Sequence, residues 1–538
     1  MGARTLKAEE IPVNVVGSST FGVHHKISSE KTYNMLISDE WLIDFPGYKR
    51  VYELFGNIGE GRGIFSSIRG NFILAIINSQ VIRFDENIAP TTIGSLATAS
   101  GEVFIEENLN NQICIVDGVN AYIYNHSLPP NLTIQVLGGG VIPNYVTFQN
   151  TLFLFGNADR STNGAFWPAY AFDTATTIVQ VALMTLQTKP DYAIAVLRIP
   201  SQGGNILVFG TSVCEVHTFQ AGLLPYKRNN TISIDYGCLS VSTIDECDEY
   251  IAWLGVNEKS SPVILVYTGQ GAQRISSDGI DNQLGNLKFP SHSTAMFLKV
   301  YGHLIYQLTF YHPEDNLTLF YDFTTQKFFN LSDENLNYHH ARNYVYFNQK
   351  NYFVSINNAS LYEISTNITV IDENIGNAQD QTKIHDLQTI RICANLKRTN
   401  SDRFIANRFV MTLEQGNDPD VTGASLNNIT YLIVEQPTDP PNILITTEDG
   451  FFIVEEYAPN FAGNNNSTIP YQPRVDLTIS LDGGVTWSST VSKNLNPFGM
   501  RRNILSWNGL GMCNYLTLKL RFWGRSRFVA ANGVVEVR

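Results

Sequence analysis

The stretch Asn71-Phe-Ile-Leu-Ala-Ile-Ile-Asn-Ser-Gln-Val-Ile-Arg-Phe84 consists of two short apolar runs with polar, turn-forming residues between them. The runs are rich in β-branched and aromatic residues, which suit a pleated and half-buried surface. Asn and Ser between two such runs are typical of a tight turn. The stretch therefore predicts a strand, a turn and a second strand that ends in an aromatic residue.

Units of this kind recur along the chain, and their spacing indicates the architecture. They start at residues 71, 112, 151, 205, 250, 303 and 351, so the gaps are 41, 39, 54, 45, 53 and 48 residues. Periods of roughly 40–50 residues are typical of four-stranded propeller blades. One blade cannot bury both of its faces, so blades pack around an axis. We expect an all-β protein with a six- or seven-bladed β-propeller over residues 60–366. An irregular array of β-sandwiches with an accidental period is the alternative.

The repeat ends near residue 366, and the remaining sequence indicates a different unit. Two arginine-bearing strands are expected at 403–413 and 515–522, and Pro-, Asn- and Gly-rich stretches lie between them at 437–442 and 459–473. We interpret residues 367–538 as a second, β-sandwich-like C-terminal domain. Residues 1–59 are expected to form an N-terminal arm that joins the first blade.

The composition narrows the functions that the chain can have. Of its 538 residues only 16% are charged, while 12% are aromatic, and the net charge is −13. Because affinity for phosphate comes mainly from Lys and Arg, such a protein is a poor general binder of nucleic acid through its outer surface. An acidic channel wall, along which DNA slides without binding, is compatible with this charge.

Cysteine usage and apolar runs also bear on compartment and cofactors. The six Cys residues form no C-x-x-C pair, so we expect small buried hydrophobic groups rather than a disulfide scaffold or a zinc site. A polar start and the lack of a run of about 18 apolar residues predict neither a secretion signal nor a membrane span. We expect no cofactor and no bound metal.

The segment Ser480-Leu-Asp-Gly-Gly-Val-Thr-Trp487 matches the Asp-box pattern S-x-D-x-G-x-T-W. In that pattern the aspartate, here Asp482, accepts backbone N–H groups, and glycine, here Gly483 and Gly484, supplies unusual dihedrals in a tight hairpin. Asp-boxes recur in sialidases, which are propellers, so glycan cleavage is one alternative. It would require two spatially paired carboxylates. A single copy outside the repeats favours a structural hairpin.

Other chemistry-bearing patterns give weaker signals. The pairs His24-His25 and His339-His340 are adjacent, and neighbours on a strand point to opposite faces, which disfavours chelation of one metal. No H-E-x-x-H, G-x-S-x-G or phosphate-binding loop is present. Arg501-Arg502 and Arg525-Ser-Arg527 are the densest basic spots. We interpret them as surface or ion-paired arginines, with an intersubunit or DNA-facing contact as the alternative.

Three segments in the same order resemble the packaged-DNA stabilisation proteins of short-tailed bacteriophages. The first is Tyr33-Asn-Met-Leu36, followed by a Phe-Pro-Gly turn at 45–47, and the second is the strand–glycine–strand element at 262–276. The third combines the turn at 480–484 with Trp507-Asn-Gly-Leu-Gly511 and Leu518-Lys-Leu-Arg-Phe522. Met512-Cys-Asn and a long loop at about 416–473 depart from the family pattern. The positions that carry the resemblance are Asn34, Phe45, Pro46, Gly47, Asp482, Gly483, Gly484, Trp507, Leu510, Gly511 and Arg521.

The resemblance implies a non-enzymatic protein of the virion tail, assembled in the host bacterial cytoplasm. Such proteins form a tail hub or nozzle, built as a six-fold homohexameric ring below the portal and its adaptor ring. They seal the packaged DNA, conduct it on ejection, and hold a tail needle, fibre or spike. The signature positions then have structural roles, and no catalytic residue is carried over. A glycan-binding adhesin or a glycan-cleaving propeller remains the alternative.

Overall fold

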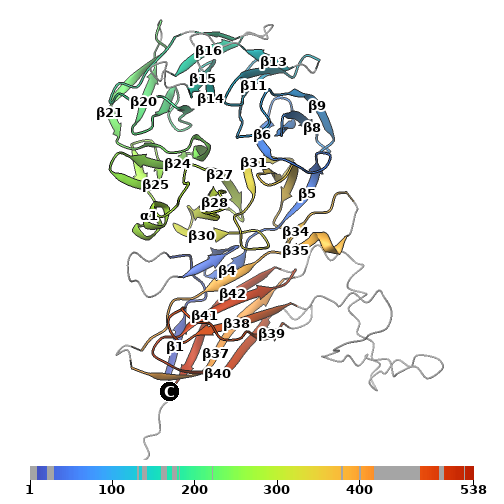
Figure 1. The fold of residues 1–538 in the computed structure, drawn as a ribbon, viewed down its shortest axis with the longest axis vertical. Helices are drawn as coiled ribbons and strands as arrows, with labels where there is room; N and C mark the ends of the chain where they lie inside the picture. Colours follow the sequence, from blue (N-terminus) through green and yellow to red (C-terminus); the bar gives the residue numbers. More distant parts are fainter. Residues whose placement is uncertain are drawn as a thin grey trace, which may run out of the picture.

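The computed structural model describes residues 9–20, 30–129, 132–135, 142–158, 166–171, 178–180, 182–220, 222–376, 380–398, 402–416, 473–495, 502–525 and 527–538. Seven antiparallel sheets surround one axis in the upper part of Figure 1, and a β-sandwich lies below them. This arrangement confirms an all-β chain with a propeller and a second β domain, and the number of blades is seven.

The first four blades are consecutive four-stranded meanders, numbered here in chain order. Their strands are β6 (Gly61–Ser67), β7 (Phe72–Ile77), β8 (Gln80–Phe84) and β9 (Pro90–Ser95) in blade 1, β10 (Phe104–Glu107), β11 (Gln112–Val116), β12 (Ala121–Asn125) and β13 (Leu132–Gln135) in blade 2, β14 (Pro143–Gln149), β15 (Leu152–Asn157), β16 (Trp167–Ala171) and β17 (Ile178–Gln180) in blade 3, and β18 (Ala195–Arg198), β19 (Asn205–Phe209), β20 (Cys214–Phe219) and β21 (Tyr226–Ile234) in blade 4.

The last three blades are less regular, and the seventh takes a strand from the N-terminal part of the chain. They comprise β22 (Gly237–Cys238), the 3-10 helix η2 (Val241–Thr243), β23 (Asp245–Cys247), β24 (Tyr250–Asn257), β25 (Ser260–Tyr267) and β26 (Ala272–Arg274) in blade 5, β27 (Ser293–Val300), β28 (His303–Phe310), β29 (Leu317–Asp322) and β30 (Lys327–Leu331) in blade 6, and β31 (Ala341–Phe347), β32 (Lys350–Ser355), β33 (Ser360–Ile364) and β5 (Tyr48–Glu53) in blade 7. Helix α1 (Asp278–Gly285) follows blade 5 in the chain and packs against its strand β25.

Ring closure follows from this N-terminal strand and from the packing between blades. Strand β5 pairs with β33 in the antiparallel sense, so segments about 300 residues apart in sequence form one sheet. Separate apolar clusters fill the space between successive blades, and one cluster joins Ile73 and Phe84 of blade 1 to Phe347 and Leu361 of blade 7. Burying these apolar faces is the main favourable contribution to closing the ring.

The tight turns between the first and second strands of several blades use asparagine in the left-handed region. Asn71, Asn111, Asn150 and Asn348 have φ values of 52°, 59°, 49° and 47°. Asparagine tolerates this conformation better than most residues, and such turns match the twist of a β-hairpin. The asparagine-rich composition therefore has a local structural cause.

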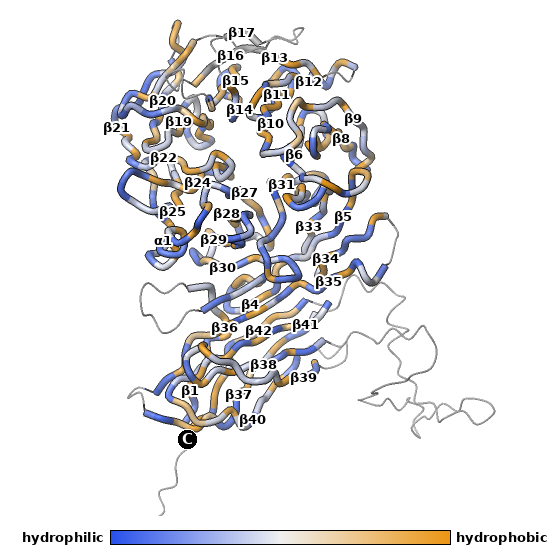
Figure 2. The backbone as a smooth tube through the Cα atoms, viewed as in Figure 1, coloured by the Kyte–Doolittle hydropathy of each residue, from blue (hydrophilic) through white to orange (hydrophobic). Residues whose placement is uncertain are grey.

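The second unit is a sandwich of two sheets. One sheet has the order β3 (Met35–Ser38), β4 (Trp41–Asp44), β42 (Phe528–Val537), β37 (Phe404–Gln415) and β40 (Arg502–Cys513), with β1 (Glu9–Val13) also on β42. The other contains β2 (Lys31–Tyr33), β36 (Thr389–Ile392), β41 (Thr517–Trp523), β38 (Arg474–Ser480) and β39 (Val491–Asn494). Buried and exposed residues alternate along β37 and β40, as expected when one sheet face packs inward (Figure 2).

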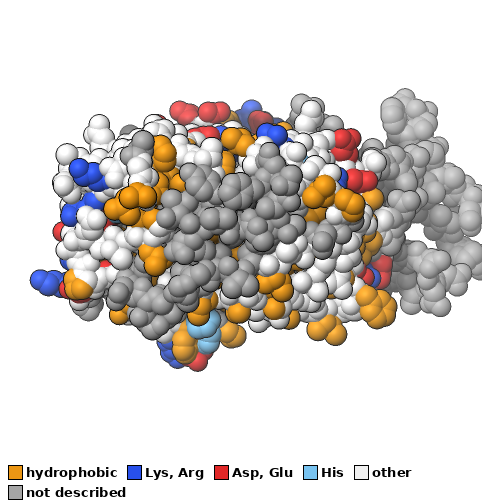
Figure 3. All heavy atoms as spheres, turned by 90° about the horizontal axis from the view of Figure 1, so that it is seen from above, with side chains coloured by type: hydrophobic (Ala, Val, Ile, Leu, Met, Phe, Trp, Pro, Cys, Tyr) orange, Lys and Arg blue, Asp and Glu red, His pale blue; other side chains and the backbone are white. Residues whose placement is uncertain are grey.

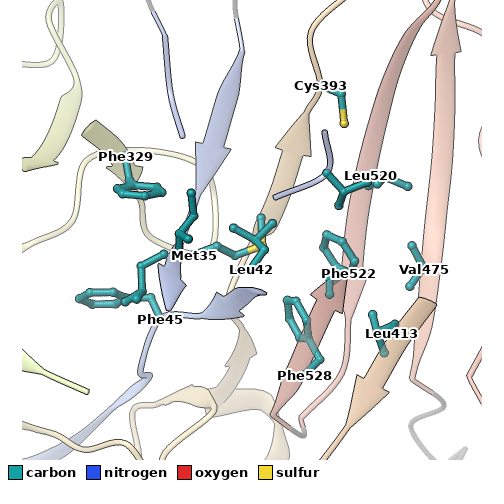
Figure 4. Close-up of a cluster of buried hydrophobic side chains, with 14 of the residues drawn as sticks. Met35, Leu42, Phe45, Phe329, Cys393, Leu413, Val475, Leu520, Phe522 and Phe528 are labelled. Atoms are coloured by element: carbon teal, nitrogen blue, oxygen red, sulfur yellow. The ribbon is translucent and has the colours of Figure 1, made fainter. Parts of the chain in front are cut away.

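Propeller and sandwich are joined by continuous sheets and by one shared core. Strand β2 pairs in parallel with β30 of blade 6. Strand β34 (Val370–Asp372) pairs in parallel with β5 of blade 7. On its other side β34 pairs with β35 (Ile384–Asp386), which follows the 3-10 helix η3 (Gln381–Lys383). Phe329 of blade 6 and Phe45 belong to the same buried cluster as Phe522 and Phe528 of the sandwich (Figure 4). Backbone pairing and buried apolar contact therefore both connect the two units.

The segment expected to be an arm thus contributes strands to the sandwich, to the sheet of blade 6 and to blade 7. The division of the chain at residues 59 and 366 stays a prediction. Five cysteines are buried and Cys247 is half-buried, all as free thiols, which agrees with their expected role as small apolar groups. In the described part of the chain, no helix is long and apolar enough to cross a bilayer.

Candidate functional site at the propeller axis

The inner strands of the blades bring charged side chains together at the propeller axis. Arg198, at the end of β18 in blade 4, contacts two carboxylates from different blades. Its Nη1 lies 3.2 Å from Oε1 of Glu106 on β10 in blade 2, and its Nη2 lies 2.7 Å from Oε1 of Glu246 on β23 in blade 5. Blades 2 and 4 are separated by blade 3, so the Arg198 side chain spans the inner side of that blade and links blades 2, 4 and 5.

A second ion pair lies where blade 7 meets blade 1. Arg342, on β31, places Nη1 2.9 Å from Oε2 of Glu60 and donates to the carbonyl of Gly61 at 3.1 Å. Glu102, which precedes β10, lies near Arg342 and beside Ser242, Thr294 and Asn343 of blades 5, 6 and 7. Polar side chains from most of the blades therefore meet near the propeller axis.

Burial sets the electrostatics of this axial cluster. Burial raises the pKa of Glu102 to about 7 and that of Glu246 to about 7, although Arg342 and Arg198 respectively oppose the shift. Burial also raises the pKa of Asp245 to about 6. Removing a carboxylate from water disfavours its charged form, and the guanidiniums compensate only in part.

The chemistry available at the axis is proton binding and ion pairing. Within the described residues, no group of three or more His, Cys, Asp or Glu side chains is arranged to hold a metal ion. The carboxyl groups of Glu106 and Glu246 share one guanidinium, so both are committed to a structural contact. This arrangement fits ion pairs that hold blades together better than the catalytic carboxylate pair of a glycosidase, which must face a sugar.

Sequence reasoning did not find these residues, although a weak signal is present. Arg198, Glu106 and Glu246 sit in inner strands that are otherwise apolar or short, namely Ala195-Val-Leu-Arg198, Phe104-Ile-Glu-Glu107 and Asp245-Glu-Cys247. A charged residue within such a strand indicates a special environment. The pairing of one blade with another could not be derived from the sequence because it depends on the ring geometry.

The N-terminal signature residues lie at the junction of propeller and sandwich. Asn34 is fully buried at φ 55°, and Phe45 packs against Phe320 of blade 6 with ring centroids 5.6 Å apart. Pro46 and Gly47 are buried in the link from β4 to β5. A Cβ on Gly47 would lie 2.2 Å from the carbonyl oxygen of Val370, so close backbone approach requires the glycine. The φ of Gly47 lies outside the left-handed region, which differs from the turn expected there.

The Asp-box folds as the expected hairpin. Both carboxylate oxygens of Asp482 accept from Thr486, one of them also accepts from Ser480 and from the Val485 N–H, and these bonds lower its pKa well below the ordinary value. Gly483 and Gly484 have φ values of 79° and 99°. The hairpin is far in the fold from the axial cluster, at the edge of the sandwich sheet that carries β38.

The remaining C-terminal signature residues belong to the sandwich. Trp507 is 2% exposed, stacks on Phe409 and donates its indole N–H to the carbonyl of Val491 at 3.0 Å, which confirms that it is buried. Leu510 is buried beside it in the core, and Gly511 has a φ of 108°. Arg521 lies over the ring of Trp523 and donates to Gln388.

The basic spots and histidine pairs are also placed where they are described. Arg527 pairs with Asp44 at 2.6 Å and Arg525 with Asp386 at 3.4 Å, as expected for ion-paired arginines. His339 and His340 are buried side by side in blade 7, and burial lowers the pKa of both. Arg502 is exposed, while Arg501 and the pair His24-His25 lie outside the described residues.

These observations define a class of protein: a seven-bladed β-propeller, with ion pairs between its inner strands, that shares sheets and an apolar core with a β-sandwich. The family model described as "Bacteriophage P22 Gp10, beta-propeller" matches residues 30–369, more than half of the chain. The chain therefore belongs to this family, and it is a structural protein of a bacteriophage virion. It is expected to assemble with other virion proteins.

Other comparisons are distant. No curated protein matches the chain. A streptogramin B lyase structure has a TM-score of 0.41 at 11% identity and covers 61% of this chain and 99% of that one. The N-terminal domain of Nup159 gives 0.36 at 10%, covering 62% and 98%, and virginiamycin B lyase from Staphylococcus aureus gives 0.40 at 9%, covering 58% and 97%. Likenesses at this level carry no inference about this chain.

Proposed function

We propose that the protein is a tail hub or nozzle subunit, which forms a ring below the portal and its adaptor, seals the packaged DNA and conducts it on ejection. Membership of the phage Gp10 family over residues 30–369 is the observation that carries this proposal. The ring is a homohexamer, and its free surfaces hold a tail needle, fibre or spike.

The braced axis supports a conduit between subunits rather than within one. Arg198 of blade 4 reaches Glu106 of blade 2 and Glu246 of blade 5 at 3.2 and 2.7 Å, so one side chain bridges the inner strands of three blades. Duplex DNA, whose major groove alone is about 12 Å wide, cannot pass between inner strands that a single side chain bridges. DNA that moves through such a tail must therefore run through a lumen that several copies enclose.

The surface chemistry supports a wall along which DNA slides. The net charge is −13, and the face seen from above carries scattered Lys and Arg among Asp, Glu and hydrophobic side chains (Figure 3). Arg525 and Arg527 are already paired with carboxylates of the same chain. The described part of this face has no continuous basic field, and non-specific DNA binding depends on the attraction that such a field provides.

The continuous sheets between propeller and sandwich suit a subunit that withstands the pressure of packaged DNA. A ring that holds DNA under pressure needs subunits whose parts do not separate. Here parallel pairing of Tyr33 with Asn330 and of Ile371 with Tyr48 ties the two units by backbone hydrogen bonds, and the shared core adds apolar contact. Breaking such a junction requires exposing buried surface on both sides.

The test combines imaging with DNA retention. An amber mutation in the gene should give heads that fill with DNA and then lose it, and supplying the protein in trans should restore retention. Cryo-electron microscopy of virions should place a six-fold ring of this chain below the portal. Heads that keep their DNA without the protein, or density for this chain only at a distal fibre, would contradict the hub assignment.

The glycan-binding or glycan-cleaving alternative is tested separately. Its carboxylate pair would have to come from the axial cluster or another face, and the Glu106 and Glu246 carboxyls both bind Arg198. Purified protein should neither release sugar from host surface polysaccharide nor bind to host cells. Either activity, lost in a Glu106→Gln and Glu246→Gln variant that still folds, would favour the alternative.

A further inference from the structure

The axial cluster contains more acidic than basic groups. Around the axis, the guanidiniums of Arg198 and Arg342 face five carboxyl groups, namely those of Glu60, Glu102, Glu106, Asp245 and Glu246. A third buried guanidinium, that of Arg62, interacts with Asp117 and Glu60, so acids still outnumber basic groups. Five buried or half-buried carboxylates cannot all be ionised at low cost with so little positive charge.

The phenol of Tyr145 shows how closely the acids gather. Burial raises the pKa of Tyr145 well above its ordinary value, and the charges of Asp245, Glu246, Glu106 and Glu102 raise it further. These four carboxyl groups come from two inner strands and the segment before one of them, so they surround a single point. Because they belong to blades 2 and 5, repulsion between them acts across the ring.

Glu246 has one oxygen that ionisation would leave unsatisfied. Its Oε1 accepts from Arg198, but its Oε2 is buried and has no hydrogen-bond partner in the described part of the chain. The side chain is only 16% exposed. A buried carboxylate oxygen without a donor is costly, whereas a protonated carboxyl group carries no charge there.

Glu102 belongs to the same group of acids, but its surroundings differ from those of Glu246. The nearest guanidinium, that of Arg342, is already bound to Glu60 and to the carbonyl of Gly61. The neutral side chains of Ser242, Thr294 and Asn343, from blades 5, 6 and 7, form hydrogen bonds with Glu102 that lower its pKa, but the effect of burial is larger. Neutral dipoles stabilise a carboxylate less than a free cation does.

We propose that the propeller axis is a proton-binding site: Glu246 and Glu102 hold protons in the folded subunit near neutral pH, and losing those protons weakens the ring of blades. The raised pKa of each group, about 7 against an ordinary value of 4.5, agrees with this assignment. A carboxyl group whose pKa is raised on folding stabilises the protein below pH 4.5, and that stabilisation is lost as the pH rises through about 7.

The experiment measures the melting temperature of the whole chain at pH 6.5 and pH 8.5. The wild-type Tm should be lower at pH 8.5. Glu246→Gln and Glu102→Gln remove the ionisation but keep the shape, so at pH 8.5 each should raise Tm by about 2 °C or more above wild type and flatten the pH dependence. Glu258→Gln, which removes an exposed carboxyl group at the β24–β25 turn, is the matched control and should do neither.

A second measurement does not depend on the variants folding. Infrared difference spectra of the wild-type chain should show a protonated carboxyl band at pH 6.5 that disappears between pH 6.5 and 8.5. Absence of that band would overturn the proposal. Variants whose Tm falls equally at both pH values would also overturn it. In either case the ionised carboxylates, and not the protonated ones, would stabilise the ring of blades. The outcome does not depend on the role of the protein in the tail.

Discussion

The side chain of Asn34 and the residue Ser332 form two reciprocal hydrogen bonds that join the N-terminal segment to the end of blade 6. The Asn34 amide donates to the Ser332 hydroxyl at 2.9 Å, and its Oδ1 accepts the Ser332 N–H at 2.8 Å. A third bond, to the carbonyl of Gln388 at 3.0 Å, extends the contact to the segment before β36. One buried amide thus ties three parts of the chain together.

Asn34→Gly should lower the free energy of unfolding by about 2–4 kcal/mol, because it leaves buried partners without hydrogen bonds. Glycine accepts the φ of 55°, so the loss reports the side chain rather than the backbone. Urea denaturation provides the measurement. Asn348→Gly, at an exposed turn with a φ of 47°, is the matched control. Equally small losses of unfolding free energy in both variants would contradict the conclusion that the Asn34 side chain stabilises this junction.

Gly47→Val should impair folding or ring assembly. A side chain at this position would meet the backbone of Val370, whose carbonyl oxygen and nitrogen would lie 2.2 and 2.6 Å from the new Cβ. Backbone cannot yield as a side chain can, so β5 and β34 would have to separate. Yield of soluble protein and of complete particles is measured beside Gly203→Val, where nothing lies within 4 Å. Normal particles from Gly47→Val would show that the junction can shift.

Trp507→Ala should destabilise the chain by about 3–5 kcal/mol and clearly lower its Tm. The change removes the stacking on Phe409, the indole hydrogen bond to Val491 and most of the apolar contact of a side chain that is 2% exposed. Trp41→Ala, at a position 38% exposed, serves as the comparison in the same calorimetric scan. A loss no greater than that of Trp41→Ala would be inconsistent with this packing.

The buried histidines should make the protein sensitive to acid. Burial lowers the pKa of His339 to about 3 and that of His340 well below 6.5, while His340 bonds to Tyr48 and Ser355 at 2.9 Å each. A lowered histidine pKa gives stability that is present above about pH 6.5 and is lost as the pH falls. His340→Gln should reduce the loss of Tm between pH 6.5 and pH 5, whereas the exposed His292→Gln should not. If His340→Gln loses as much Tm between pH 6.5 and pH 5 as the wild type, His340 is not the cause of the acid sensitivity.

The isolated subunit should bind duplex DNA weakly, even at low salt. Its net charge is −13, and the described arginines at 525 and 527 are held in ion pairs. A gel-shift titration at low ionic strength measures the affinity, with a basic DNA-binding protein as the positive control. Tight, salt-sensitive binding would point instead to a DNA contact at the Arg501-Arg502 pair, and it should then weaken in Arg502→Ala.

The local patterns were sufficient for much of the fold. Apolar runs such as Phe72–Ile77, separated by Asn and Gly turns at intervals of about 40–50 residues, predicted strands and blades because these features depend on neighbouring residues only. The buried Trp507 and the Asp482 hairpin followed in the same way from local sequence. A strand's tendency to form and its turn chemistry are properties of the segment itself.

The tertiary structure alone decided the remaining features. Three features depend on residues brought together from distant parts of the chain. Strand β5 completes blade 7, Gly47 allows close contact with Val370, and Arg198 reaches Glu106 and Glu246. The sequence by itself determined an all-β repeat, an acidic surface and a resemblance to a phage family. It could not determine which blade faces which, because ring closure, burial and the resulting charge balance at the axis arise only when every blade is in place.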